Sequence, residues 1–210
     1  MNWKISLGIL AVAGSAAAVA SNSTARIRAA QVIKTIRTST QPAAFNEQIV
    51  KQMASKVERP IIMPLSNPTS KCEALPSDVI RWTEGRALVA AGSPFAPVTY
   101  NGSTYRIAQA NNALIFPGLG LGVTVARASR VTDRMLAAAA DAVAALSDAT
   151  TVGASLLPSV EQLRMVSAAV GVAVAQAADS EGIAQADLDN LVQQIHQAMW
   201  RPAYPKIELV

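Results

Sequence analysis

An apolar run of strand length ends in a polar turn in the stretch Pro60-Ile61-Ile62-Met63-Pro64-Leu65-Ser66-Asn67-Pro68-Thr69. A second apolar run, Ala87-Leu88-Val89-Ala90-Ala91, is closed in the same way by Gly92-Ser93-Pro94. Short apolar runs without alternating polar residues are typical of strands that are buried on both faces, as in parallel sheets. The two stretches therefore predict an α/β fold.

Helical segments separate the predicted strands. Apolar residues recur at helical spacing between Asn46 and Val57, after an earlier β-prone piece at Val32–Ile36, and a short helix is predicted at Pro76–Trp82. Alternation of strands and helices indicates a parallel sheet, whose ligands bind beyond the carboxyl ends of the strands. We therefore expect the turns that follow the strands to line one edge. These turns are Thr38–Pro42, Ser66–Thr69 and Gly92–Pro94.

The second half of the chain predicts a long loop and then only helices. The loop runs from Pro94 to Ala110 and carries the turn signal Tyr100-Asn101-Gly102. Apolar periodicity, glycines and capping residues predict the helices that follow. Their expected ranges are Ala113–Ala128, Asp133–Leu146 with Thr132 as its cap, Pro158 to about Asp179, and Ala184–Trp200, followed by an extended tail at Arg201–Val210.

Two adjacent amides, Asn111 and Asn112, stand where the long loop meets the first of these helices. One interpretation is that Asn111 simply caps the helix. The other is that the pair holds a polar or anionic ligand, since unpaired N–H groups and the positive end of the dipole lie at a helix N-terminus. The residues themselves leave both interpretations open.

The composition excludes several kinds of site. The chain has 210 residues, of which 51% are hydrophobic and 4% aromatic, with one cysteine, Cys72, and one histidine, His196. An intrachain disulfide, a cysteine-based metal site and a multi-histidine metal site are therefore excluded for this chain alone. His196 is expected on a helix surface, and no base partner for the Cys72 thiol is evident in the sequence.

The net charge of +4 is concentrated near the N-terminus. Residues 1–46 contain no acidic residue and five basic residues, which are Lys4, Arg26, Arg28, Lys34 and Arg37. The other 164 residues carry 13 basic and 14 acidic groups and are close to neutral. Because a phosphate-binding surface needs clustered basic side chains, we expect no nucleic-acid partner.

Residues 1–20 resemble a targeting segment. A basic start at Lys4 precedes an apolar run that ends in Ala18-Val19-Ala20 before Ser21, as in a secretory signal. The absence of acids and the content of Ser, Arg and Ala up to residue 40 also fit an organellar transit peptide. A third alternative is an N-terminus without a targeting role.

The glycines in Gly118-Leu119-Gly120-Leu121-Gly122 resemble a nucleotide-binding loop only superficially. A preceding strand and the spacing of a dinucleotide fingerprint are both missing. We expect these glycines to allow close packing of the helix against its neighbours.

Three long motifs, in order along the chain, resemble malic enzymes. They are Glu58 to Ser70, Trp82 to Phe95 with Pro97-Val98, and Gln109 to Gly122. The similarity runs from about residue 32 to the C-terminus. The resemblance implies a partial Rossmann-like parallel sheet followed by a C-terminal set of helices. It divides the chain into a signal-like or unstructured segment at 1–31 and the C-terminal portion of an NAD(P)-binding domain at 32–210.

Malic enzymes oxidise and decarboxylate malate to pyruvate with NAD or NADP and a divalent metal, Mg²⁺ or Mn²⁺. The resemblance implies that Asn67 lies where nicotinamide and malate meet, that Asn112 binds a malate carboxylate, and that Ser39 contacts the cofactor. A neutral amide can orient a dianion without competing for its metal. The family would place the protein in the cytoplasm, unless residues 1–20 direct it to an organelle or out of the cell.

The resemblance also implies what this sequence lacks. The family's tyrosine and lysine acid/base pair, its metal carboxylates and its glycine-rich phosphate loop have no counterpart here. Arg37 and Ala110 stand where the family has glycine, and Arg37 is expected to obstruct the cofactor. We therefore expect a chain that is catalytically incomplete alone. It would form a homo-oligomer, complement a separate N-terminal half, act as a non-catalytic assembly module, or be a gene remnant.

Overall fold

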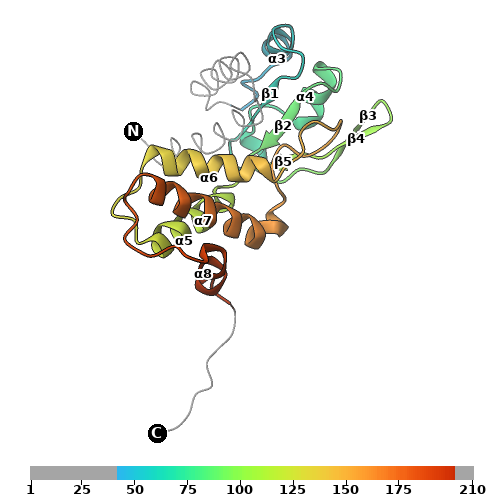
Figure 1. Ribbon diagram of the computed structural model, residues 1–210. Helices are drawn as coiled ribbons and strands as arrows, with labels where there is room; N and C mark the ends of the chain where they lie inside the picture. The colour runs from blue at the N-terminus through green and yellow to red at the C-terminus, as the bar shows by residue number, and fades with distance from the viewer. Residues whose placement is uncertain (1–41, 202–210) are drawn as a thin grey trace.

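The computed structural model describes residues 42–201 as a small sheet covered by helices (Figure 1). Several predicted features lie outside these residues. They are the targeting segment at 1–20, the strand at Val32–Ile36, the positions of Arg37 and Ser39 with most of the Thr38–Pro42 turn, and the tail beyond Arg201. The described residues fall inside the predicted domain at 32–210, so the boundary at residue 32 stays a prediction.

The central sheet has three parallel strands in the order β1-β2-β5. They are β1 (Ile61–Ile62), β2 (Leu88–Ala91) and β5 (Ala108–Gln109). Ile61 pairs with Leu88 on one side of β2, and Ala90 pairs with Ala108 on the other. Every residue of β2 is buried. The predicted parallel sheet with unbroken apolar strands is confirmed, although β1 is shorter than the apolar run that predicts it.

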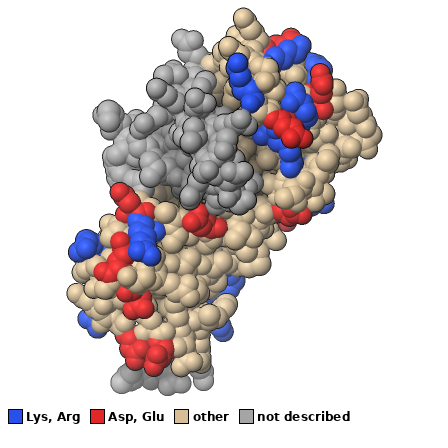
Figure 2. Space-filling view, turned by 45° about the horizontal axis from the view of Figure 1, so that its top comes forward, with Lys and Arg blue, Asp and Glu red and all other residues tan. Residues whose placement is uncertain are grey.

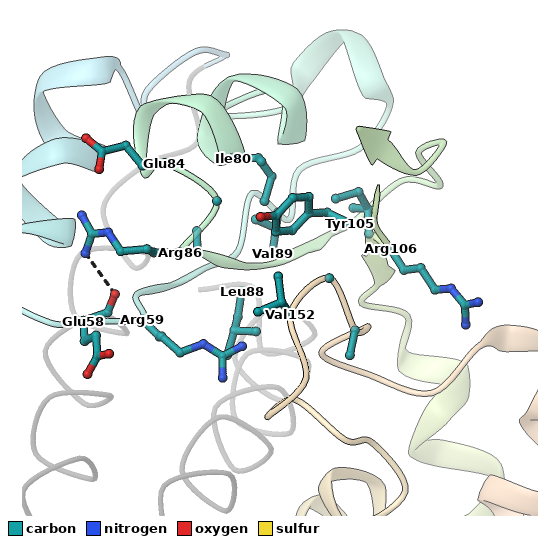
Figure 3. A pocket seen from close by; sticks show the side chains of 15 residues that line it. Glu58, Arg59, Ile80, Glu84, Arg86, Leu88, Val89, Tyr105, Arg106 and Val152 are labelled. Carbon is teal, nitrogen blue, oxygen red and sulfur yellow. Dashed lines mark hydrogen bonds between the residues drawn. The ribbon is translucent and has the colours of Figure 1, made fainter. Parts of the chain in front are cut away.

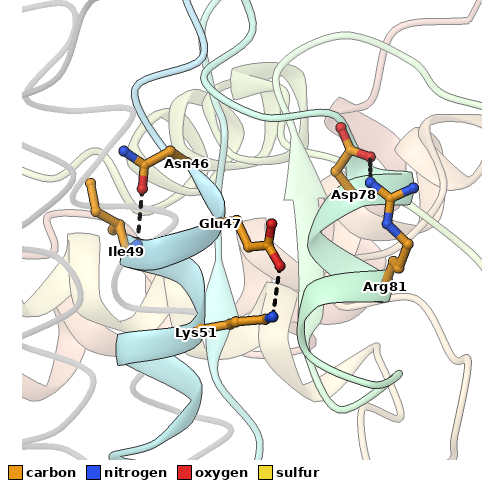
Figure 4. A network of polar contacts seen from close by, with 6 residues as sticks. All are labelled: Asn46, Glu47, Ile49, Lys51, Asp78 and Arg81. Atoms are coloured by element: carbon orange, nitrogen blue, oxygen red, sulfur yellow. Dashed lines mark hydrogen bonds and ion pairs between the residues drawn. The ribbon is translucent and has the colours of Figure 1, made fainter.

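Two short helices, α3 (Glu47–Ala54) and α4 (Pro76–Trp82), match the predicted positions. The Asn46 side chain caps α3 by accepting a hydrogen bond from the Ile49 N–H at 3.0 Å (Figure 4). Each helix also carries one ion pair, Lys51–Glu47 at 2.6 Å and Arg81–Asp78 at 2.7 Å. Exposed pairs of this kind contribute little free energy, so packing holds the helices in place. A 3-10 turn, η1 (Thr69–Lys71), precedes α4.

The two faces of the sheet belong to separate hydrophobic cores. Val89 packs with Val50, Val79 and Ile80 of α3 and α4. Its neighbours Leu88 and Ala90 belong instead to the larger core formed by the C-terminal helices. Successive side chains of a strand point to opposite faces, so β2 contributes side chains to both cores.

The prediction of an irregular loop from Pro94 to Ala110 is wrong for most of that segment. It contains an antiparallel hairpin of β3 (Val98–Tyr100) and β4 (Ser103–Tyr105), followed directly by β5. The predicted turn is present at its tip, where Asn101 and Gly102 both have positive φ, +48° and +78°. Positive φ at two successive residues suits a tight hairpin. Strands of two or three residues are too short to show alternation in the sequence.

The C-terminal half is helical, as predicted, with corrected boundaries. Its elements are η2 (Asn112–Leu114), α5 (Phe116–Ala126), α6 (Asp133–Ala145), η3 (Val160–Gln162), α7 (Leu163–Ser180) and α8 (Leu191–Ala198). Thr132 caps α6 by accepting from the Met135 N–H at 3.2 Å. The predicted start at Ala113 is wrong because Pro117 belongs to the first turn of α5. The predicted start at Ala184 is wrong because Asn190, with φ +59°, is left-handed.

Helices α5 and α7 pack closely, and glycines of α5 make this possible. A Cβ at Gly118 would lie 2.5 Å from the Val170 Cβ, and one at Gly122 would lie 2.5 Å from the Gly171 carbonyl oxygen. The glycine run therefore serves helix packing, as expected from the sequence. None of the described helices is both long and apolar enough to span a bilayer.

Candidate functional site

Three chain segments meet at the carboxyl edge of the sheet, where β1, β2 and β5 end. The Gly92 N–H, after β2, donates to the Pro64 carbonyl after β1 at 3.0 Å. The Ala110 N–H, after β5, donates to the Ala91 carbonyl at 2.8 Å. A Cβ at Gly92 would lie 2.1 Å from the Leu65 carbonyl oxygen, so only glycine permits this approach. The turns at Ser66–Thr69 and Gly92–Pro94 therefore share one edge, as predicted.

Asn67 and Ser93 are brought together at this edge. The Ser93 hydroxyl donates to the Asn67 Oδ1 atom at 2.6 Å. Ser93 is buried, whereas Asn67 is exposed. The oxygen of the amide is thus engaged by the protein, whereas its Nδ2 group has no hydrogen-bond partner within residues 42–201 and remains a donor. Such a donor suits a carboxylate or a carbonyl oxygen of a ligand.

A buried carboxylate, Glu73, supports this loop from behind. Its Oε2 atom accepts from the Ser66 N–H at 3.1 Å, and its Oε1 atom accepts from the Ser66 hydroxyl at 2.6 Å. Only 5% of Glu73 is exposed, and the Phe45 N–H donates to its carbonyl at 3.0 Å. Sequence reasoning missed Glu73, because a single glutamate beside a cysteine gives no signal that it is buried.

The two amides at the head of the C-terminal half have different roles. Asn111 is the cap of η2, and its Oδ1 atom accepts from the Ala113 N–H at 2.9 Å. Asn112 is exposed, and its side chain forms no hydrogen bond with any other residue of 42–201. The capping interpretation is therefore confirmed for Asn111, while Asn112 has its amide free at the same edge as Asn67. The role of Asn112 as a ligand stays a prediction, as does that of Ser39.

Cys72 is not placed for nucleophilic chemistry. Burial is the main cause that raises the pKa of the Cys72 thiol, and backbone hydrogen bonds at Ala74 and Glu73 oppose this rise. The thiol itself donates to the Ala74 carbonyl at 3.0 Å, which favours its protonated form. A thiol that stays protonated in an apolar site is inert. His196 is exposed on α8, and Asp133, Asp141, Asp187 and Asp189 are exposed too.

A cavity of about 290 Å³ lies at the opposite, amino edge of the sheet (Figure 3). Residues just before β1, β2 and β5 line it, and the Tyr105 side chain belongs to this lining. Arg86 donates to the carbonyls of Ala54 and Glu58 at 3.1 and 3.0 Å, and so binds the end of α3 to the start of β1. This arginine therefore connects elements of the fold.

The described part of the chain lacks a cluster of metal ligands, and its charges are mixed on the face shown in Figure 2. Within residues 42–201, no three His, Cys, Asp or Glu side chains gather as metal ligands. Figure 2 shows acidic and basic side chains intermixed where they gather, with wide uncharged areas between them. At the carboxyl edge, this part of the chain offers the amides of Asn67 and Asn112, whose N–H groups suit a small anion.

Known proteins resemble most of this chain. The profile of a family described as "Malic enzyme, NAD binding domain" matches residues 15–179. NAD-dependent malic enzyme 3 of Bacillus subtilis (strain 168) is 52% identical over 184 residues, which are 88% of this chain and 32% of that protein. NAD-dependent malic enzyme of Acinetobacter baylyi is 50% identical over 171 residues, 80% of this chain and 30% of that protein.

A solved structure agrees with these sequences. The crystal structure of malic enzyme from Pyrococcus horikoshii Ot3 matches with a TM-score of 0.60 and 29% identity, over 77% of this chain and 33% of that chain. The chain thus spans about a third of the length of the relatives that it matches. Family profile, sequence identity and fold agree, and the chain belongs to the malic enzyme family, with the sequence of its NAD-binding domain.

Proposed function

We propose that this chain forms the carboxyl edge of an NAD and malate site and takes part in the oxidative decarboxylation of malate to pyruvate. The observation that carries this proposal is the Asn67 amide at the strand ends, whose oxygen is held by Ser93 and whose nitrogen has no hydrogen-bond partner among residues 42–201. In open α/β sheets this edge is the usual place for ligands. Asn112 supplies a second free amide on the same edge.

Malate suits this arrangement because both of its carboxylates and its hydroxyl oxygen accept hydrogen bonds. In this proposal Asn67 donates at the junction of malate and the nicotinamide, and Asn112 donates to a carboxylate. Amides orient a substrate by direct hydrogen bonds and take no proton from it, so their contribution is positioning. NAD, when bound, supplies the hydride acceptor of the family reaction.

NAD is the preferred cofactor in this proposal, because the relatives named above are NAD-dependent enzymes. Ser39 is proposed as a further cofactor contact on the strength of the family resemblance alone. A divalent metal would have to be held by residues other than 42–201, where no cluster of suitable ligands is present. We therefore assign neither a metal ligand nor an acid/base residue to the described part of the chain.

We further propose that the chain works in assembly with the rest of a malic-enzyme fold. A groove of about 840 Å³ runs between α7 and α8, and Ala168, Ala169, Val172 and Ala173 contribute to its apolar lining. At its border, Met165 is 48% exposed and Val192 is 58% exposed. Exposed apolar areas of this kind mark surfaces that other protein covers. Relatives three times as long contain sequence that could cover it.

Ligand binding tests the site. The purified chain is titrated with NAD and L-malate by calorimetry, next to Asn67→Ala and Asn112→Ala variants. Losing one oriented hydrogen bond to a charged ligand should weaken malate binding by roughly tenfold or more in each variant. Gln52→Ala, which removes an exposed amide from α3, is the matched control and should bind as the unchanged chain does. Equal affinities for all four proteins would refute the assigned roles.

Complementation tests the assembly. The chain is co-expressed with the part of a homologous malic enzyme that precedes its matching third, and NADH formation is followed with malate and Mn²⁺. We expect a complex by size exclusion and activity only when both parts are present. Turnover by the chain alone would contradict the proposed need for a partner, and absence of any complex would contradict the assembly.

A further inference from the structure

The loop that carries Asn67 is held at two points by buried polar side chains. On one side, the Ser93 hydroxyl donates to the Asn67 Oδ1 atom at 2.6 Å. On the other, the Glu73 carboxylate accepts both donors of Ser66, the residue directly before Asn67. Ser93 is 7% exposed and Glu73 is 5% exposed, so water competes little for either contact. These four residues are here termed the Asn67 brace.

We propose that Ser93 and Glu73 are positioning residues that make Asn67 present its Nδ2 donor, and not its Oδ1 acceptor, to an anionic substrate. This inference rests on the proposed function, since it concerns the same site. It assigns roles to two side chains that would not touch the substrate themselves.

The direction of the Ser93 hydrogen bond decides which end of the amide faces outward. With the hydroxyl donating to Oδ1, the buried O–H is satisfied and Nδ2 is directed to the ligand. In the flipped orientation, Nδ2 would donate to Ser93, and the buried O–H would need another acceptor. Among the described residues, Asn67 Oδ1 is the only hydrogen-bond partner of the Ser93 hydroxyl. The flipped amide would also direct its oxygen at a carboxylate, which repels it.

Glu73 acts one step farther from the ligand. Both oxygens of Glu73 accept hydrogen bonds from Ser66, one from the backbone N–H and one from the side-chain hydroxyl. This double contact fixes the chain at Ser66 as it leaves the sheet. The position of the Asn67 backbone is thus set by Glu73, and the rotation of its amide is set by Ser93.

Four variants separate positioning from stability. Ser93→Ala removes the donor to Asn67, and Ser93→Thr keeps it. Glu73→Gln keeps the volume but turns an NH₂ group toward one of the two Ser66 donors. Ser155→Ala is the matched control, because the Ser155 hydroxyl donates to the Leu157 carbonyl at 2.7 Å in a loop elsewhere in the fold. Thermal unfolding is measured for every variant, so that lost stability can be set against lost affinity.

Two measurements are made on each protein. One is the dissociation constant for L-malate in the presence of NAD. The other is the side-chain Nδ2H₂ signal of Asn67 in a nitrogen–proton correlation spectrum, assigned by its loss in Asn67→Asp. We expect malate affinity to fall about tenfold in Ser93→Ala and Glu73→Gln, and to stay within about twofold in Ser93→Thr and Ser155→Ala. The Asn67 signal should shift with malate in the unchanged chain and lose its fixed position in Ser93→Ala.

The outcomes distinguish this inference from the function on which it rests. If the unchanged chain binds neither malate nor NAD, even together with the complementing part, the proposed function fails and the inference fails with it. If the unchanged chain binds malate and Ser93→Ala binds it equally well, the inference alone is overturned. If Ser155→Ala loses as much affinity as Ser93→Ala at equal loss of stability, the brace has only a structural role and the inference is again overturned.

Discussion

At the scale of single residues, neighbours in the sequence have different roles at the carboxyl edge. Asn111 uses its Oδ1 atom to cap η2, so that atom is not available to a ligand. Asn112 has its amide exposed. Likewise, Ser66 is tied to the buried Glu73, and the next residue, Asn67, reaches solvent. In each pair, one residue forms a hydrogen bond that stabilises the local backbone, and the next residue faces solvent.

The two asparagines should respond differently to truncation. Asn111→Ala removes a cap and should lower the free energy of unfolding by about 1 kcal/mol. Asn112→Ala should change that free energy by less than about 0.5 kcal/mol, because the exposed amide has no partner within the described residues. Urea unfolding followed by circular dichroism measures both. Equal destabilisation by the two variants would show that their roles are not separated in this way.

The single cysteine should be protected by the fold. Because burial raises the pKa of the Cys72 thiol, alkylation by iodoacetamide at about pH 8 should be slow in the native chain and fast in urea. Cys72→Ala provides the blank, since no other thiol is present. Rapid labelling without unfolding would mean that Cys72 is accessible and ionised.

The same thiol gives stability a dependence on pH. The folded pKa lies above the ordinary value of 9.0, so the native state holds the proton more tightly than the unfolded chain does. The stabilisation is complete below the ordinary pKa and is lost as the pH rises through the folded pKa. Between about pH 8 and about pH 10, the unfolding free energy should fall more steeply in the unchanged chain than in Cys72→Ala. Parallel curves for the two proteins would contradict this.

At the scale of elements, glycines allow backbones to approach closely where helices and loops pack together. Gly118 and Gly122 lie directly against α7, and Gly92 lies directly against the chain after β1. Gly120, in the same α5 run, has open space around the position of a Cβ. The spacing of contacts on one helical face explains the difference, since residues 118 and 122 are four apart and residue 120 points elsewhere.

Alanine substitutions at Gly118 and Gly120 of α5 should therefore change the free energy of unfolding in opposite directions. A Cβ at Gly118 would meet the Ser167 carbonyl oxygen at 2.7 Å as well as Val170, so Gly118→Ala should destabilise the chain by about 1–3 kcal/mol. Gly120→Ala adds a methyl group without a clash and should stabilise it by up to about 1 kcal/mol, because alanine is the better helix former. Denaturant unfolding of the two variants measures both effects, and a loss of stability in Gly120→Ala would contradict the packing described.

At the scale of the whole molecule, a small sheet couples two cores. The α3 and α4 side and the α5, α6 and α7 side share no cluster, yet both receive side chains from β1 and β2. Figure 1 shows α3 and α4 away from the C-terminal helices, with the strands between them. Loss of β2 would therefore disrupt both cores at once.

We expect the two cores to unfold together. In a Trp3→Phe, Trp200→Phe variant, Trp82, which packs against the α3 and α4 core, is the only tryptophan. Its fluorescence and the far-ultraviolet circular dichroism of the whole chain should report the same thermal midpoint. Because Val89 is buried in that core, Val89→Ala should lower both midpoints equally. Two separate transitions would show that the cores are independent, and a chain without any cooperative transition would support the alternative of a gene remnant.

The sequence alone determined the α/β class, most helices and the family. Apolar runs and capping residues such as Asn46 and Thr132 act through neighbouring residues, so the structure keeps the elements that they predict. The three motifs identify the family because they occur in the same order along the chain. The β3–β4 hairpin, the late start of α8 and the burial of Glu73 were decided only by tertiary structure. Strands of two or three residues have no period of their own, and a carboxylate becomes buried only when distant segments close around it. For the same reason the sequence could name Asn67, whereas only the fold shows that Ser93 and Glu73 hold it.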